Sequence, residues 1–204
     1  MLIITFSGTD GSGKSTQLDL LRKHFERIGK NVAYFHAIEF SLANRLSRAI
    51  KGTKTFTPGH EKASTTASPF LILLRKTFLL IDLIRFRLFL HVLRQDGIDV
   101  LVSDRYFYDS VVNIEFLAGS TGRERSFQFF DEFIPSPNWS FFLDVEPDVI
   151  ASRERVPEQG IEYLTRKHSL FQSDVKRWDL IVIDGNGDPE DISRHIWKRI
   201  EKTS

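Results

Sequence analysis

The 204-residue sequence contains no cysteine, almost no net charge and no long uninterrupted apolar run. Without cysteine it can form no disulfide framework, no thiolate metal site and no thiol nucleophile. Its 28 basic and 27 acidic residues leave a formal charge of +1, so electrostatics gives no reason to expect a nucleic-acid partner. The six histidines are scattered without metal-ligand spacing, which favours surface or packing roles.

The most apolar segment, residues 69–94, is interrupted by charged residues such as Arg75, Asp82 and Arg85. A membrane span requires about 18 or more uninterrupted apolar residues, so we expect a long helix and no span. Its apolar residues occupy more than one face, which favours packing on the sheet with one side and on a second subunit with the other. Burial of the whole helix within a monomer is the alternative. The chain starts without a basic region or a small-residue cleavage site, so a cytoplasmic protein is expected.

Strand-like and helix-like patterns alternate along the rest of the chain, and the length suits one domain over residues 1–204. The strands are expected at 2–6, 31–36, 99–103, 140–145 and 180–184. Short strand-helix-strand spacing predicts parallel strands with right-handed crossovers, and therefore an α/β fold. Residues 52–68 are polar and rich in turn formers, which is typical of a functional or mobile loop.

A glycine-rich stretch, "FSGTDGSGKST" at residues 6–16, joins the first strand to a helical pattern. Gly8, Gly13, Lys14 and Ser15 fit the G-x-x-x-x-G-K-[ST] motif, in which backbone N–H groups surround a β-phosphate at a helix N-terminus. Lys14 is expected to reach the β- and γ-oxygens, and the Ser15 hydroxyl to ligate Mg²⁺. The alternative, a glycine turn with an incidental lysine, is disfavoured by the strand-loop-helix context.

A second chemical signal is "DVLVSDRYFYDS", residues 99–110. It places Asp104 at the carboxyl end of a buried strand, the edge where ligands bind in open α/β sheets. Asp104 is expected to hold Mg²⁺ through water opposite Ser15, and the planar fork of Arg105 to grip a phosphate. A salt bridge that caps the sheet is the alternative reading.

A third signal is a basic segment after the fourth strand. In it, a turn that contains proline and glycine is flanked by Arg153, Arg155, Arg166 and Lys167. This pattern predicts a lid over about 153–167 that closes on phosphates and neutralises charge. A solvated charged helix surface is the alternative.

Together, "FSGTDGSGKSTQ", "VSDRYFYDS", "FFLDVEPD" and "IDGNGDPEDI" resemble the thymidylate kinase family of P-loop nucleoside monophosphate kinases. The resemblance spans nearly the whole chain in order. It implies a P-loop NTPase fold, with a five-stranded parallel sheet flanked by helices on both faces and a short lid. It also implies ATP and Mg²⁺ as cofactors, phosphorylation of dTMP to dTDP, and a homodimer.

Position by position, the resemblance implies three groups of site residues besides the metal ligands Ser15 and Asp104. The catalytic residues are Asp10, Lys14, Arg105, Arg153 and Arg155. ATP would contact Gly8, Asp10, Gly11, Ser12, Gly13, Lys14, Ser15, Thr16, Arg153, Asn186 and Asp188. The acceptor would contact Asp10, Glu39, Ile81, Arg85, Arg105, Tyr106 and Ser110. Among these, Asp10 would bond the acceptor sugar, Arg105 its phosphate, and Arg153 would border the adenine.

The sequence departs from the family where the family reads the base. "HAIEF" replaces Arg-Glu-Pro-Gly-Gly and leaves only Glu39 as a counterpart, and Ile81 replaces the phenylalanine that stacks on the pyrimidine. Asn113 and Ile114 replace the base-reading Tyr-Gln pair. Phosphoryl transfer is therefore predicted more firmly than thymidylate as its acceptor.

Three other functions remain for comparison. A kinase of the same fold could act on another nucleotide, a sugar or a lipid-linked alcohol, which the lost base-reading residues favour. A nucleotide switch would need an Asn-Lys-x-Asp segment, and the sequence has none. An idle ATP-binding module has no physical need for Lys14, Ser15, Asp104 and Arg105 together.

Overall fold

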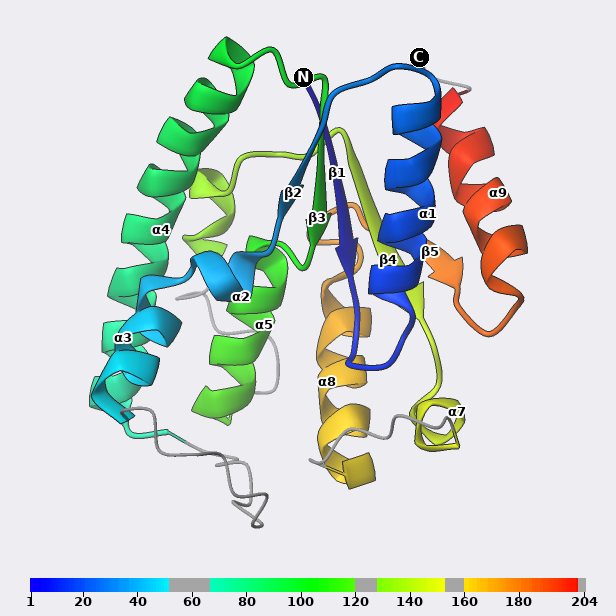
Figure 1. Cartoon of the computed structure of the whole chain (residues 1–204). Coiled ribbons are helices and arrows are strands. Elements are labelled where there is room, and N and C mark those ends of the chain that lie inside the picture. The colour runs from blue at the N-terminus through cyan, green and yellow to red at the C-terminus, as the bar shows by residue number, and fades with distance from the viewer. Residues whose placement is uncertain (52–66, 120–127, 153–159, 202–204) are drawn as a thin grey trace.

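The computed structural model describes residues 1–51, 67–119, 128–152 and 160–201. Its described centre is a sheet of five parallel strands in the order β2-β3-β1-β4-β5 (Figure 1). The strands are β1 (Leu2–Ser7), β2 (Val32–Phe35), β3 (Val100–Asp104), β4 (Trp139–Asp144) and β5 (Ile181–Asp184). Each lies within one or two residues of its predicted position, so the predicted α/β fold with a five-stranded parallel sheet is confirmed. The continuous apolar runs of the central strands fit burial on both faces.

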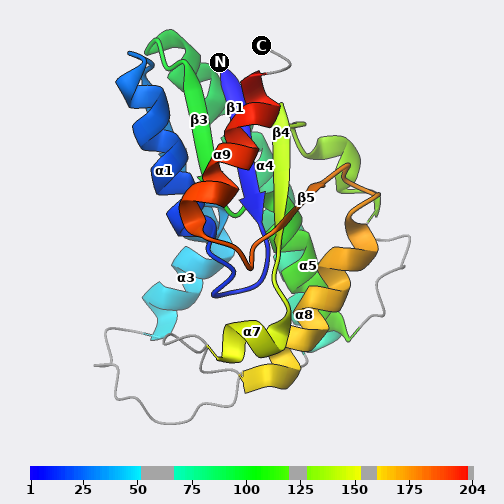
Figure 2. The same cartoon turned by 90° about the vertical axis from the view of Figure 1, so that its right-hand side faces the viewer.

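Alternate residues of the strands feed two cores on opposite faces of the sheet. In β1, Ile3 belongs to one core, whereas Ile4 and Phe6 belong to the other. On the second face, α1 (Lys14–Arg27) and α9 (Pro189–Glu201) supply the covering side chains. The first face is covered by α4 (Pro69–Gln95), α5 (Phe107–Ala118) and α8 (Gly160–Asp174). Figure 2 shows the two helix layers on either side of the sheet.

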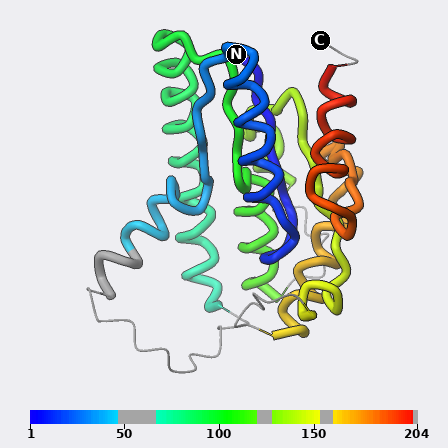
Figure 3. The backbone as a smooth tube through the Cα atoms, turned by 45° about the vertical axis from the view of Figure 1, so that its right-hand side comes forward, coloured from blue at the N-terminus to red at the C-terminus, as the bar shows by residue number. Residues whose placement is uncertain are grey.

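Short helices gather beyond the carboxyl ends of the strands (Figure 3). They are α2 (Ala37–Phe40), α3 (Leu42–Lys51) and α7 (Pro147–Ala151), while a 3-10 helix, η1 (Asp131–Phe133), lies between α5 and β4 in the sequence. In open α/β sheets, this end of the molecule is where ligands bind.

The predicted long helix is confirmed as α4, which runs one residue beyond its predicted end. Its start is fixed by Ser68, whose hydroxyl accepts a hydrogen bond from Leu71 N at 3.3 Å, and by Pro69 at the first helical position. Gly97, with a φ of +73°, follows shortly after its end. No helix among the described ranges combines the length and apolar character needed to cross a bilayer.

Candidate active site

The glycine-rich loop occupies residues 8–13, between β1 and α1. Gly8 has a φ of +145°, and a Cβ there would lie 2.9 Å from the Leu143 carbonyl oxygen, so a side chain would not fit. Gly13 is the N-cap residue directly before α1 and has a φ of +96°. The loop therefore presents backbone N–H groups at a helix N-terminus, which is a ready site for a phosphate.

Lys14 and Ser15 follow the loop in the first turn of α1. The Lys14 ammonium is buried and donates a hydrogen bond to the Thr9 carbonyl at 2.7 Å. Burial lowers the pKa of Lys14, while the charges of Asp109 and Asp104 oppose that shift. A phosphate in the loop would supply the anion that this buried ammonium needs.

Ser15 and Asp104 meet across the sheet edge, as the sequence led us to expect of a shared metal site. The Ser15 hydroxyl donates to Asp104 Oδ2 at 2.5 Å. Asp104 is the last residue of β3 and is paired with Phe6 of β1, which fixes the carboxylate beside the loop. A hydroxyl and a carboxylate are hard oxygen ligands, so the pair fits Mg²⁺.

Arg105 is held in an unusual backbone conformation, with a φ of +66°. Its N–H donates to the Phe6 carbonyl at 3.0 Å, and its own carbonyl accepts from the Ser103 hydroxyl at 2.6 Å. The guanidinium forms an ion pair with Asp10 of the glycine-rich loop. A non-glycine residue held at positive φ stores strain, which is typical of functional sites.

Asp109 is a buried carboxylate that sequence reasoning missed. Its Oδ2 accepts from the Ser7 hydroxyl at 2.6 Å and from Tyr106 N at 3.1 Å, which joins the start of the loop to α5. Burial raises the pKa of Asp109, and the charge of Arg105 opposes this. The available signal was its place three residues after Tyr106, where a carboxylate caps a helix.

A cavity of about 720 Å³ opens beside Arg105, between α2, α3, α4, α5 and α8. Small-molecule sites span roughly 300–1,000 Å³, so this volume suits a nucleotide-sized acceptor. Of the predicted acceptor residues, Glu39, Arg105 and Ser110 lie on its wall. Asn113 and Ile114, which replace the base-reading pair of the family, also line it.

Asp10 of the glycine-rich loop and three other predicted acceptor residues do not lie on the cavity wall. Ile81 is 39% exposed on the outer side of α4. Tyr106 is fully buried, with its hydroxyl donating to the Pro135 carbonyl at 2.7 Å. Arg85 lies over the ring of Phe40, with 4.4 Å from its guanidinium carbon to the ring centroid, and it forms an ion pair with Asp82 three residues before it. Acceptor contacts by these residues stay predictions.

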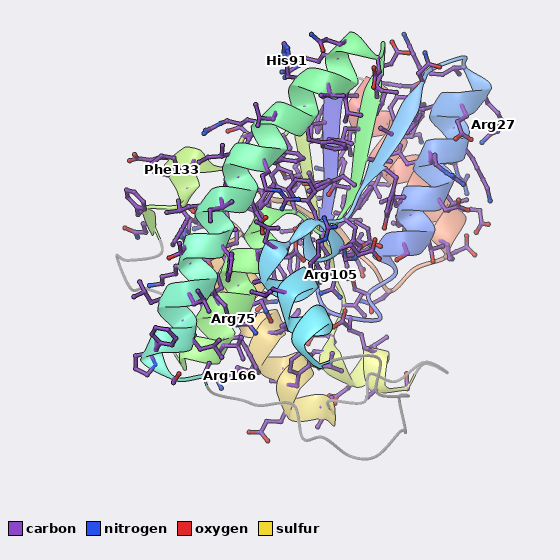
Figure 4. The ribbon with its side chains drawn as sticks, turned by 60° about the vertical axis from the view of Figure 1, so that its left-hand side comes forward. Arg27, Arg75, His91, Arg105, Phe133 and Arg166 are labelled. Carbon is purple, nitrogen blue, oxygen red and sulfur yellow. The ribbon has the colours of Figure 1, made fainter. Side chains whose placement is uncertain are left out.

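Two cations on the cavity wall were not assigned to the acceptor by sequence reasoning. Arg75 of α4 lines the cavity, and its Nε is buried without a hydrogen-bond partner in the described part of the chain. Burial lowers the pKa of Arg75. Lys167 of α8 lines the cavity as well. Figure 4 labels Arg75 on α4 and Arg105 near the carboxyl ends of the strands. In the sequence, Arg75 stood out only as an interruption of an apolar helix.

The predicted lid and adenine border are only partly within the described residues. Arg153 and Arg155 fall in 153–159, outside them, and residues 160–167 form the first turns of α8. Asn186 lines a smaller pocket of about 160 Å³ at the ends of β4 and β5. Asp188 caps α9 by accepting from the first backbone N–H groups of that helix. The nucleotide contacts of these residues stay predictions.

Comparison with known proteins shows the family of this chain. The sequence profile of the family described as thymidylate kinase matches residues 6–196. The chain belongs to the thymidylate kinase family. It is thus a nucleoside monophosphate kinase, as predicted from the sequence.

Family relatives match along nearly their whole length, but at low identity. The thymidylate kinase of Francisella tularensis subsp. novicida is 23% identical, with 98% of this chain and 95% of that protein covered. That of Chlorobaculum parvum is 24% identical with the same shares covered. The crystal structure of thymidylate kinase from Ehrlichia chaffeensis has a TM-score of 0.65 at 18% identity, with 98% of each chain covered, which supports the fold.

Proposed function

We propose that this protein transfers the γ-phosphoryl group of ATP to dTMP and forms dTDP and ADP. The observation that carries the proposal is Arg105, whose guanidinium lies between the glycine-rich loop and the cavity. One anion site and one acceptor cavity therefore meet at a single arginine. Membership of the thymidylate kinase family supports dTMP as the acceptor.

The proposed reaction needs no nucleophilic side chain. An oxygen of the acceptor phosphate attacks the γ-phosphorus, the bond between that phosphorus and the β,γ-bridging oxygen breaks, and ADP leaves with those electrons. The enzyme aligns the two phosphates and stabilises the charge that spreads over the transferred group. In this chain Lys14 faces the donor phosphates and Arg105 the acceptor phosphate.

We propose that Ser15 and Asp104 hold Mg²⁺, since their oxygens already lie in contact at the edge of the loop. Bound there, the ion would neutralise charge on the β- and γ-phosphates. The Ser15 hydroxyl would then turn from Asp104 toward the metal.

Other predicted contacts follow from the position of the loop. Gly8, Gly11, Ser12 and Thr16 would surround the ATP phosphates, with Asp10 between them and the acceptor. Asp10 pairs with Arg105 in the structure, and we propose that it also accepts a hydrogen bond from an acceptor sugar hydroxyl. The adenine would lie near the Asn186 pocket, with Arg153, Arg155 and Asp188 as the remaining predicted contacts.

We further propose a cytoplasmic homodimer with one catalytic domain per chain. The outer side of α4 exposes apolar residues at successive steps of four, seven, three and four, which keeps them on one face as a candidate helix-helix seam. They are Phe70, Leu74, Ile81, Ile84 and Leu88. The cytoplasm is proposed because the reaction consumes ATP.

An acceptor panel tests the proposed function. ADP release would be measured with ATP, Mg²⁺ and each of dTMP, dUMP, dCMP, dGMP and CMP. We expect the highest kcat/KM with dTMP. Because Ile81, Asn113 and Ile114 replace base-reading residues of the family, a higher kcat/KM with another monophosphate would support the kinase activity and replace dTMP as the proposed acceptor. Absence of ADP release with every acceptor would contradict the proposal.

A further inference from the structure

Lys167 is a buried lysine that forms no ion pair within the described part of the chain. Its side chain belongs to the cavity wall, yet the residue is only 7% exposed. The ammonium lies 4.8 Å from the centroid of the Tyr163 ring, one turn earlier on α8. Across the ranges that the structure describes, it forms no hydrogen bond or ion pair. A buried charge without a partner is costly, so the position indicates a missing anion.

Unlike Lys167, two other charged residues near the cavity have ion-pair partners. Arg105 is paired with Asp10, and Asp82 is paired with Arg85. In the described residues the direct contact of the Lys167 ammonium is a ring face, and a cation-π contact is weaker than a buried ion pair. Its neighbour His168 points elsewhere, to Asp144 at 2.5 Å.

The surroundings of Lys167 are those of a phosphate-transfer site. Burial lowers the pKa of Lys167 to about 7, and the charges of Arg105 and Lys14 add to the lowering. Asp109, in α5, raises it and is the only carboxylate among these neighbours. Three basic side chains, Lys14, Arg105 and Lys167, therefore lie near one another where the acceptor phosphate and the γ-phosphate of ATP must meet.

We propose that Lys167 binds the acceptor phosphate together with Arg105. The inference rests on the proposed function and adds a residue to it. A phosphate dianion would supply the missing partner, and the ammonium would stay beside the acceptor oxygen as that oxygen attacks. Since Arg105 already shares its charge with Asp10, a second cation is needed to balance the dianion.

Binding should therefore be coupled to uptake of a proton. Above pH 7, most of Lys167 is neutral in the empty cavity, because its pKa is about 7. A bound dianion favours the ammonium form and raises this pKa. Acceptor binding then takes up a proton from solution and weakens as the pH rises above 7. The second ionisation of dTMP cannot imitate this, since dTMP is already a dianion at pH 8 and could only release protons at lower pH.

The test is titration calorimetry of the full-length protein with dTMP at pH 8, in buffers that differ in ionisation enthalpy. Wild type should take up a substantial fraction of a proton per dTMP, because pH 8 lies above the pKa of Lys167 in the empty cavity and much of the lysine is neutral there. Lys167→Met should lose the uptake and bind dTMP roughly 10–100-fold more weakly, as expected for a lost charge-assisted hydrogen bond. Lys167→Arg should keep most of the affinity but take up no proton, because an arginine is always charged. Lys176→Met, at an exposed lysine beyond α8, is the matched control.

The possible outcomes separate this inference from the proposed function. Proton uptake that persists in Lys167→Met, or wild-type affinity and turnover in that variant, would overturn the role of Lys167 and leave the kinase intact. Coupled uptake with another monophosphate but no binding of dTMP would support Lys167 and overturn dTMP as the acceptor. If no monophosphate binds to wild type, both proposals fail.

Discussion

At the scale of single residues, two arginines of α4 have different surroundings. Arg85 forms an ion pair with the buried carboxylate of Asp82 and donates to the Phe40 carbonyl at 3.1 Å, which joins α4 to α2. Arg75 lies on the cavity wall, with its Nε unpaired among the described residues. The geometry thus favours a stabilising role for Arg85 and an acceptor-binding role for Arg75.

Paired substitutions test this difference. Arg85→Met should lower the free energy of unfolding by about 1–3 kcal/mol, because Asp82 stays buried without its cation. The same variant should leave the acceptor KM nearly unchanged. Arg75→Met should raise that KM roughly 10-fold through loss of a charge-assisted contact, with little change in stability. The measurements are thermal unfolding and acceptor kinetics of both variants. A raised KM with unchanged stability in Arg85→Met would instead support the acceptor contact implied by the family resemblance.

At the scale of elements, α4 has a buried side and an exposed apolar side. Leu79, Leu83, Phe86 and Leu90 face the core. The exposed seam defined above lies on the opposite side of the helix, which forms the flank of the molecule at the left of Figure 1. Such a stripe is unfavourable in water and suits a second copy of the same helix.

Charge in this seam should separate the subunits. Ile84→Glu with Leu88→Glu would place four carboxylates in a two-fold interface, so we expect a monomer by size-exclusion chromatography with light scattering. Ile28→Glu, at an exposed apolar residue just after α1, should remain a dimer. A wild-type protein that is monomeric at micromolar concentration would contradict the proposed homodimer.

At the scale of the whole molecule, local patterns predicted the fold well. The apolar runs that end at Ser7 and Asp104 form the neighbouring strands β1 and β3. They were predictable because the periodicity of apolar residues and the residues that favour turns are local features of the sequence. The contact of Ser15 with Asp104 also followed, because the carboxyl ends of parallel strands share one edge.

The acceptor cavity was less predictable, because its walls come from helices distant in sequence. No local pattern indicates that Arg75 lies on the same cavity as Arg105. The spacing of Asp82 and Arg85 was visible as a helical ion pair, yet the resemblance assigned Arg85 to the acceptor. The acceptor contact of Arg85 stays a prediction, since Arg85 is paired with Asp82 and does not line the cavity.

The central claim is that Arg105 presents the acceptor phosphate to a donor held by Lys14. Its most direct measurement follows the label from γ-³²P-ATP into dTDP, with wild type, Lys14→Ala and Arg105→Ala compared at equal folded concentration, as judged by circular dichroism. Wild type should form labelled dTDP, and each variant should be slower by about 10²–10³-fold, the usual loss for one electrostatic contact to the transition state. Wild-type rates of labelled dTDP formation in a folded Arg105→Ala protein would contradict the account.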